Sequence, residues 1–223
     1  MEIKLAIFHH CLLSGLEGHV HTDHAIGIMA EQMAALKDSG LLDAASEFHV
    51  GVNGDEGDAL VAAQLAGDKA RVICHGSQAK TELSTQRHLQ AWLPGHEGWR
   101  VLYHHSKGAS YHPGDTFPGQ WRRCMERAVV WGWRDCMAEM DQGMEACGCH
   151  WLTPEKYPGI IKTPFFGGTF WWATADLLMT LPKLPEDVWA NRYEAESWIG
   201  KGPRRPLIRD FHNDWPGAGC ANT

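Results

Sequence analysis

The stretch WRVLYHHSKG, residues 99–108, is the best single guide to the fold. Its apolar residues predict a buried strand over 99–105, and a stretch rich in Gly, Ser and Pro follows at 109–120. Strand alternation directs His104 into the core and His105 to the other side. The turn that ends the strand therefore presents His105, Ser106, Lys107 and Gly108, and the question is what these polar groups do there.

Upstream of this stretch, strands and helices alternate. Apolar runs predict strands at 3–13, 47–54 and 70–76, and helical spacing predicts helices at 25–40, 58–66 and 81–93. With the strand at 99–105 the order is β-α-β-α-β-α-β. We therefore expect an α/β fold with a mostly parallel central sheet and helices on both faces.

The second half of the chain is less regular. Its longest helical pattern runs over 121–143, with Gly132 in the middle. No internal repeat or clear linker occurs, so we expect one domain over residues 1–223, with a nucleotide-binding half (1–108) and an acceptor-side half (109–223).

Composition sets broad limits on function. The 223 residues are 44% hydrophobic and 21% charged, with a net charge of −7, so nothing indicates a general attraction to nucleic acid. The first apolar run is too short for a secretion signal, and no run is long enough to span a membrane, which favours a cytoplasmic protein. Seven cysteines without a Cys-x-x-Cys pair predict reduced thiols.

An open α/β sheet holds its ligand beyond the carboxyl ends of its strands. The predicted strands end at Asn53, Cys74 and His105, so we expect a pocket where these three residues meet. No Walker or Rossmann fingerprint is present, and each loop taken alone is as consistent with an ordinary polar connection.

Three ordered segments carry a family resemblance: YHHSKG (103–108), GGTFWWA (167–173) and RYEAESWIG (192–200). Together they resemble a family of small bacterial and phage glycosyltransferase-like proteins with the nucleotide-sugar-binding GT-A fold. The resemblance covers about residues 100–200. It implies a transferase that uses a nucleotide-diphosphate sugar, such as a UDP-sugar, as donor.

This chain departs from the common GT-A pattern at one place. His104, His105, Ser106 and Lys107 stand where many such enzymes have Asp-x-Asp, whose carboxylates hold a divalent metal. Either His105 is a ligand of Mn²⁺ or Mg²⁺, or Lys107 and the amides near Gly108 neutralise the diphosphate without metal.

The resemblance also implies roles for residues late in the chain. Glu196 would be the catalytic base and Arg192 its orienting partner, although a solvated Glu–Arg pair fits the same spacing. Glu194 and Glu196 project about 200° apart on a helix, so only one can face a pocket. The remaining candidates are Gly168, Trp171, Trp172 and Glu194 for substrate, Asn53 and His212 for the donor, and Asp210 with His212 for a metal.

Three functions remain open at this point. The first is glycosyl transfer to a hydroxyl acceptor, either a glycan or a hydroxymethylated base in phage DNA; the basic segment 201–209 favours DNA, whereas the net charge does not. The second is a non-catalytic nucleotide- or sugar-binding module. The third is a metal-dependent hydrolase, which the scattered histidines support least.

Overall fold

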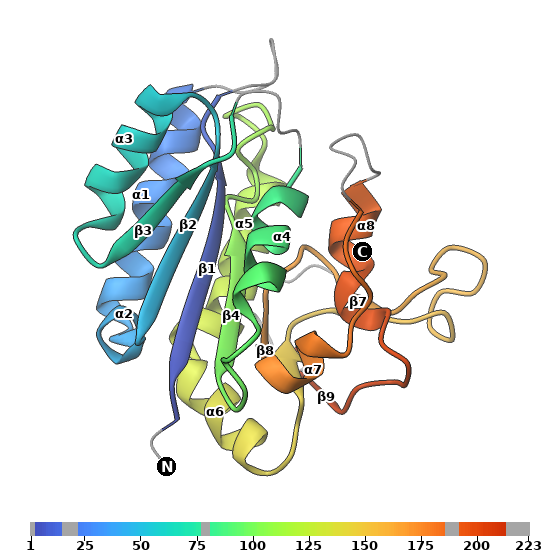
Figure 1. The fold of residues 1–223 in the computed structure, drawn as a ribbon. Coiled ribbons are helices and arrows are strands. Elements are labelled where there is room, and N and C mark those ends of the chain that lie inside the picture. Colours follow the sequence, from blue (N-terminus) through green and yellow to red (C-terminus); the bar gives the residue numbers. More distant parts are fainter. Residues whose placement is uncertain (1–2, 15–21, 77–80, 186–191, 213–223) are drawn as a thin grey trace.

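The computed structural model describes residues 3–14, 22–76, 81–185 and 192–212. A seven-stranded sheet forms its centre, with strand order β3-β2-β1-β4-β8-β5-β9. Strand β8 is antiparallel to both of its neighbours, and the other strands all run in one direction. The predicted α/β class with a mostly parallel sheet is confirmed (Figure 1).

The first half follows the predicted alternation closely. Its elements are β1 (Leu5–Leu12), α1 (Thr22–Asp38), α2 (Leu41–Ala44), β2 (Glu47–Asn53), α3 (Glu56–Ala66), β3 (Ala70–Cys74), α4 (Leu83–Trp92) and β4 (Arg100–His105). Local chemistry explains one boundary well: Asp55 caps α3, and its side chain and that of Asp58 each accept a hydrogen bond from the other's backbone N–H.

The second half adds strands that the sequence pattern did not predict. Its elements are α5 (Thr116–Glu126), the π-helix η1 (Arg127–Trp131), α6 (Trp133–Asp141), β5 (Ala146–Gly148), β6 (Trp151–Leu152), β7 (Phe165–Phe166), β8 (Trp171–Thr174), α7 (Ala175–Met179), α8 (Arg192–Ser197), the 3-10 helix η2 (Trp198–Gly200) and β9 (Ile208–Asp210). Strands β6 and β7 form a separate two-stranded sheet.

The helical pattern over 121–143 corresponds to helix as far as Asp141, and it is interrupted at Gly132. The chain forms α5, a turn of π-helix and α6, and the N–H of Gly132 donates to the Arg127 carbonyl five residues earlier. A Cβ at Gly132 would lie 2.8 Å from the Ala128 carbonyl oxygen, so this break accepts no side chain without rearrangement.

Helices cover both faces of the sheet (Figure 1). Apolar side chains of α1, α3, α5, η1 and α6 pack on one face, and those of α4, α7 and α8 on the other. Strand β1 supplies both cores by alternation, since Ile7 belongs to the first and Phe8 to the second. Within the described ranges no helix is long and apolar enough to cross a membrane.

Candidate functional site

A pocket of about 140 Å³ opens at the carboxyl ends of β1, β2 and β4. Its walls come from the strand ends, the turn after β4, the residues before α4, and α8. The lining residues are His10, Leu12, Asn53, Thr81, Glu82, 105–111 and Glu196. The residues predicted to bind the nucleotide-sugar donor, Asn53 and 105–108 of the β4 turn, therefore line one pocket. The parallel order of β2 and β4 required this. Cys74, the third predicted strand end, contacts the carbonyl of neighbouring Gly54 through its thiol and is not part of the lining.

Hydrogen bonds of Asn53 and Ser106 hold the rim of this pocket in place. The Asn53 amide donates to the Thr81 carbonyl (3.0 Å) and accepts from the Ser84 hydroxyl (3.0 Å), which joins β2 to the start of α4. The Ser106 hydroxyl accepts from the Leu12 N–H (3.0 Å), joining the ends of β4 and β1. Since these groups fix neighbouring segments, they shape the pocket whatever else they contact.

Lys107 brings positive charge to the same pocket. Its Nζ lies 4.4 Å from the centre of the Trp121 ring, a cation–π distance that places the ammonium beside α5. The charge acts on two pocket residues: it adds to burial in lowering the pKa of His105, and it partly offsets the rise that burial causes in the pKa of Glu82. A phosphate bound here would meet this cation.

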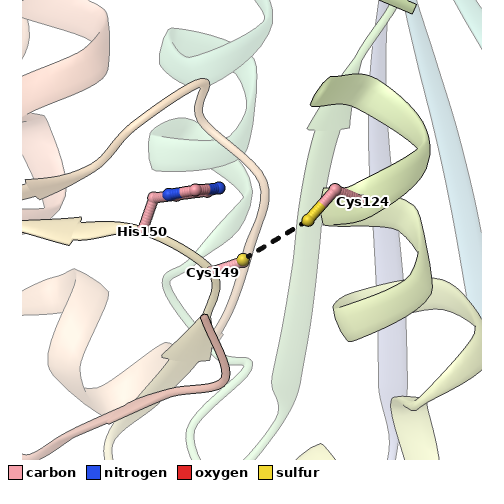
Figure 2. Close-up of side chains that lie close together, drawn as sticks. All are labelled: Cys124, Cys149 and His150. Atoms are coloured by element: carbon pink, nitrogen blue, oxygen red, sulfur yellow. Dashed lines mark hydrogen bonds between the residues drawn. The ribbon is translucent and has the colours of Figure 1, made fainter. Parts of the chain in front are cut away.

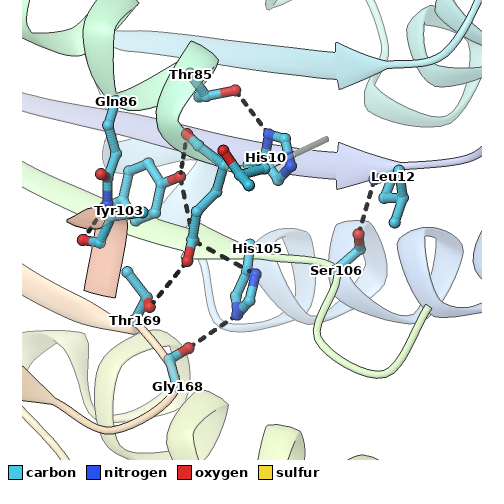
Figure 3. Close-up of polar contacts among 12 residues, drawn as sticks. His10, Leu12, Thr85, Gln86, Tyr103, His105, Ser106, Gly168 and Thr169 are labelled. Atoms are coloured by element: carbon cyan, nitrogen blue, oxygen red, sulfur yellow. Dashed lines mark hydrogen bonds and ion pairs between the residues drawn. The ribbon is translucent and has the colours of Figure 1, made fainter. Parts of the chain in front are cut away.

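His105 faces Glu82, and its polar contacts define its protonation. Its Nε2 lies 2.9 Å from the Gly168 carbonyl, which can only accept, so Nε2 carries a proton (Figure 3). Its Nδ1 lies 3.5 Å from a Glu82 carboxyl oxygen. If His105 is neutral, Nδ1 has a bare lone pair, and Glu82 must supply the proton between them. The pair therefore holds one shared proton, on Glu82 or on Nδ1.

Burial and charge put that proton on Glu82. Burial, followed by the nearby Glu196 carboxylate, raises the pKa of Glu82 to about 8, and burial followed by Lys107 lowers the pKa of His105 well below its usual value. The Thr169 hydroxyl donates to Glu82 Oε1 (3.1 Å), and the Tyr103 hydroxyl lies 3.4 Å from Oε2. Both contacts lower the pKa of Glu82, but burial raises it by more. Glu82 is thus a carboxylic acid at neutral pH.

Sequence reasoning missed Glu82. It stands at the N-cap of α4, and the stretch 81–84 suggested only a helix start. One signal was available, because the segment follows β3 and so approaches the same sheet edge. Two of the residues that contact the Glu82 carboxyl group are Tyr103 from β4 and Thr169 from the turn before β8. No sequence pattern connected them with Glu82.

Helix α8 directs one of its two glutamates to the pocket. Glu196 lines it, whereas Glu194 pairs with Lys201 on the surface. This is the division that the helical geometry required. The side chain of Arg192 lies outside the part of the chain that the structure describes, so its predicted pairing with Glu196 stays a prediction.

The tryptophan pair is not a ligand platform, and that prediction is wrong. Trp171 and Trp172 are 1% and 0% exposed and face opposite sides of the sheet. Trp171 stacks on Tyr103, and the Trp172 indole N–H donates to the Val129 carbonyl (2.8 Å). Both rings fill the core because β8 runs through the middle of the sheet. Gly168, another predicted substrate residue, contacts the pocket residue His105 through its carbonyl oxygen.

The predicted metal candidates do not come together in the pocket, because His105 lines it and Asp210 and His212 do not. Both nitrogens of His105 already face protein groups, so in this arrangement neither is available to a metal. The Asp210 carboxylate accepts from the backbone N–H groups of His150, Trp151 and His212, all at 3.0 Å. His212 packs against His150, with 4.0 Å between ring centres, and is not among the lining residues. The structure therefore places Asp210 and His212 elsewhere on the same sheet edge.

The basic segment 201–209 faces acidic partners. Lys201 pairs with Glu194, Arg204 with Glu145, Arg205 with Glu155 and Arg209 with Glu139. These ion pairs already neutralise much of the segment's charge, which weakens it as a surface for DNA phosphates.

Comparisons with known proteins give a family but no activity. A family model described as a domain of unknown function (DUF8361) matches residues 16–187. No curated protein matches the chain. Among solved structures, 4-diphosphocytidyl-2C-methyl-D-erythritol synthase is 16% identical (TM-score 0.48; 100% of this chain and 94% of that chain covered). Glucosyl-3-phosphoglycerate synthase from Mycobacterium tuberculosis is 14% identical (0.46; 96% and 73%), and a mycobacterial protein 15% (0.47; 92% and 69%). At these identities and TM-scores we assign no activity from the similarity.

Proposed function

The family model spans well over half of the chain, so the chain belongs to the DUF8361 family, and we propose that it transfers a sugar from a nucleotide-diphosphate donor to a hydroxyl acceptor. One observation carries the proposal: a cation, Lys107, a carboxyl group whose pKa is raised, Glu82, and a second carboxyl group, Glu196, line one pocket at the carboxyl edge of a mostly parallel sheet. The GT-A-like motifs of the sequence agree with this chemistry.

Lys107 supplies the donor side of the reaction. Departure of a nucleotide diphosphate leaves negative charge on phosphate oxygens, and a nearby ammonium stabilises that charge. The neutral Glu82–His105 pair adds no negative charge beside the phosphates. A divalent ion would also neutralise the diphosphate, so donor binding is measured with and without Mn²⁺ or Mg²⁺.

Glu196 supplies the acceptor side. An acceptor hydroxyl must lose its proton as it bonds to the sugar carbon, and a carboxylate can take it. Glu82 at its raised pKa keeps its own proton, so the two carboxyl groups divide into an acid and a base. Because the basic segment is ion-paired, we favour a glycan or other small hydroxyl acceptor over a hydroxymethylated DNA base.

The test separates binding from chemistry. We expect nucleoside diphosphates and nucleotide sugars to raise the melting temperature, because ligands that bind only the folded state stabilise it. We expect Glu196→Gln to lower nucleotide release from the donor by about 100- to 10,000-fold with donor affinity unchanged. Glu194→Gln, a change on the same helix, is the control and should keep full activity.

The alternative is a module that binds nucleotide or sugar without turnover. The absence of Asp-x-Asp favours it. Donor binding without turnover, with and without Mn²⁺ and across a panel of hydroxyl acceptors, would establish this alternative. The absence of any stabilisation by nucleotides would remove both functions.

A further inference from the structure

A second group of reactive side chains lies on the same sheet edge as the pocket. Strands β4, β5 and β9 run in one direction, so His105, Cys149 with His150, and His212 all follow carboxyl ends of strands. Strand β8 separates β4 from β5. Two strand spacings of about 4.8 Å therefore separate the backbones of β4 and β5.

This group has the composition of a soft metal site. The Sγ atoms of Cys124 and Cys149 and a ring nitrogen of His150 all lie within 4.8 Å of one another (Figure 2). The two sulfur atoms are 4.0 Å apart. Tetrahedral Zn²⁺ with Zn–S bonds of about 2.3 Å needs about 3.8 Å between two thiolates, so the spacing already approaches that of a bound ion.

The neighbouring imidazoles also point to a ligand. Among the described residues, His150 Nε2 and His212 Nδ1 are buried and have no hydrogen-bond partner. Buried polar atoms are normally satisfied, and a metal ion is one way to satisfy a lone pair on nitrogen. Their rings lie 4.0 Å apart, so His212 stands beside the group of Cys124, Cys149 and His150.

The backbone around His150 is held in an unusual conformation. His150 has φ 65°, in the left-handed region that residues other than glycine rarely adopt. The Asp210 carboxylate holds it there through the N–H groups of His150 and Trp151, and it also binds the N–H of His212. One acidic residue thus positions both histidines, as outer residues commonly do around a metal.

Cys124 is disulfide-bonded in this structure, which corrects the expectation that all the thiols are reduced. Among the described residues, Cys11, Cys74, Cys136, Cys147 and Cys149 have free thiols. Cys124 is among the residues of α1, α5 and η1 that line a groove. Two states of one site follow, one with Cys124 oxidised and one with Cys124 available as a thiolate.

We propose that reduction of the Cys124 disulfide creates a site for Zn²⁺ or a similar soft divalent ion, with Cys124, Cys149 and His150 as ligands and His212 adjacent to take the fourth position. A dithiol reductant gives two electrons and two protons to the disulfide, which becomes two thiols, while the reductant becomes a disulfide. Metal binding then displaces the protons of the Cys124 and Cys149 thiols. Sulfur and imidazole ligands select Zn²⁺ over Mg²⁺ or Mn²⁺, so this site is distinct from any donor-site metal.

Cobalt substitution tests the site on the full-length protein. The chain is prepared metal-free, either oxidised or reduced with a phosphine, and is titrated with Co²⁺, whose thiolate charge-transfer absorption reports sulfur ligation. We expect one equivalent of Co²⁺ to give this absorption in the reduced protein and not in the oxidised protein. Zn²⁺ should displace the cobalt and abolish the signal.

Variants identify the ligands. Cys149→Ser should lose the absorption, and Cys74→Ser, which changes an exposed free thiol, should keep it. If Cys149→Ser does not fold, His150→Asn tests the site instead, because asparagine tolerates the left-handed backbone at this position. His150→Asn should weaken Co²⁺ affinity by about tenfold or more. Equal binding in oxidised and reduced protein, no thiolate absorption after reduction, or unchanged affinity in His150→Asn would each overturn the proposal.

Discussion

Replacing Glu82 with glutamine tests whether this buried group is a neutral acid. Glutamine keeps the size of the side chain and can still donate to His105 Nδ1 and accept from Thr169, as a protonated Glu82 does. It cannot ionise. The variant should therefore retain the wild-type structure while losing the dependence of stability on pH that Glu82 causes.

The sign and size follow from the pKa. A carboxyl whose pKa is raised on folding binds its proton more tightly in the folded state, so the contribution of Glu82 to stability falls as pH rises from the ordinary value of 4.5 to about 8. Each pH unit in that interval costs the wild type about 1.4 kcal/mol relative to Glu82→Gln, and the whole interval costs about 5 kcal/mol. Below pH 4.5 the difference should be constant.

The measurement is urea unfolding, followed by tryptophan fluorescence, at several pH values between 4 and 9. Each experiment compares the wild type with Glu82→Gln and with Glu194→Gln, a surface control paired with Lys201. A free-energy difference for Glu82→Gln that does not change with pH would refute the neutral-acid assignment. A difference that moves against the variant as pH rises would place the shared proton on His105 instead.

Three further predictions concern the pocket and the core. Lys107→Ala should weaken nucleoside diphosphate binding by about tenfold or more in calorimetry, because a charged hydrogen bond is worth about 1.5–3 kcal/mol, whereas Lys201→Ala should leave binding unchanged. Gly168→Ala should destabilise the fold by about 1–3 kcal/mol in chemical unfolding, since its φ is 89° and a Cβ would lie 2.6 Å from Met125 Sδ; an unchanged midpoint would contradict this. Burial lowers the pKa of His9 well below its usual value and that of His104 to about 3, so unfolded chains bind protons at these residues that the folded chain does not, and the contribution of these two histidines to stability should fall as pH drops below about 6.5. His104→Phe should make this decline shallower, and an identical acid profile would refute that origin.

The sequence by itself determined the first half of the fold. Apolar runs and helical spacing place the strands from β1 to β4 and their helices within a few residues, because both patterns reflect local burial. Parallel order then brings Asn53 and His105 to one edge of the sheet. The helical angle between Glu194 and Glu196 also predicted that only one faces the pocket.

Only the tertiary structure decided the second half and the chemistry of the site. Strands β5, β8 and β9 are four residues or fewer, too short to give a period, and β8 enters the sheet antiparallel between β4 and β5. That insertion buries both Trp171 and Trp172 and carries Gly168 and Thr169 to the pocket. Glu82 has a raised pKa because burial and the nearby Glu196 outweigh the opposing hydrogen bonds that it accepts from Thr169 and Tyr103. These groups come from segments far apart in the chain, and a pKa depends on what lies nearby in space.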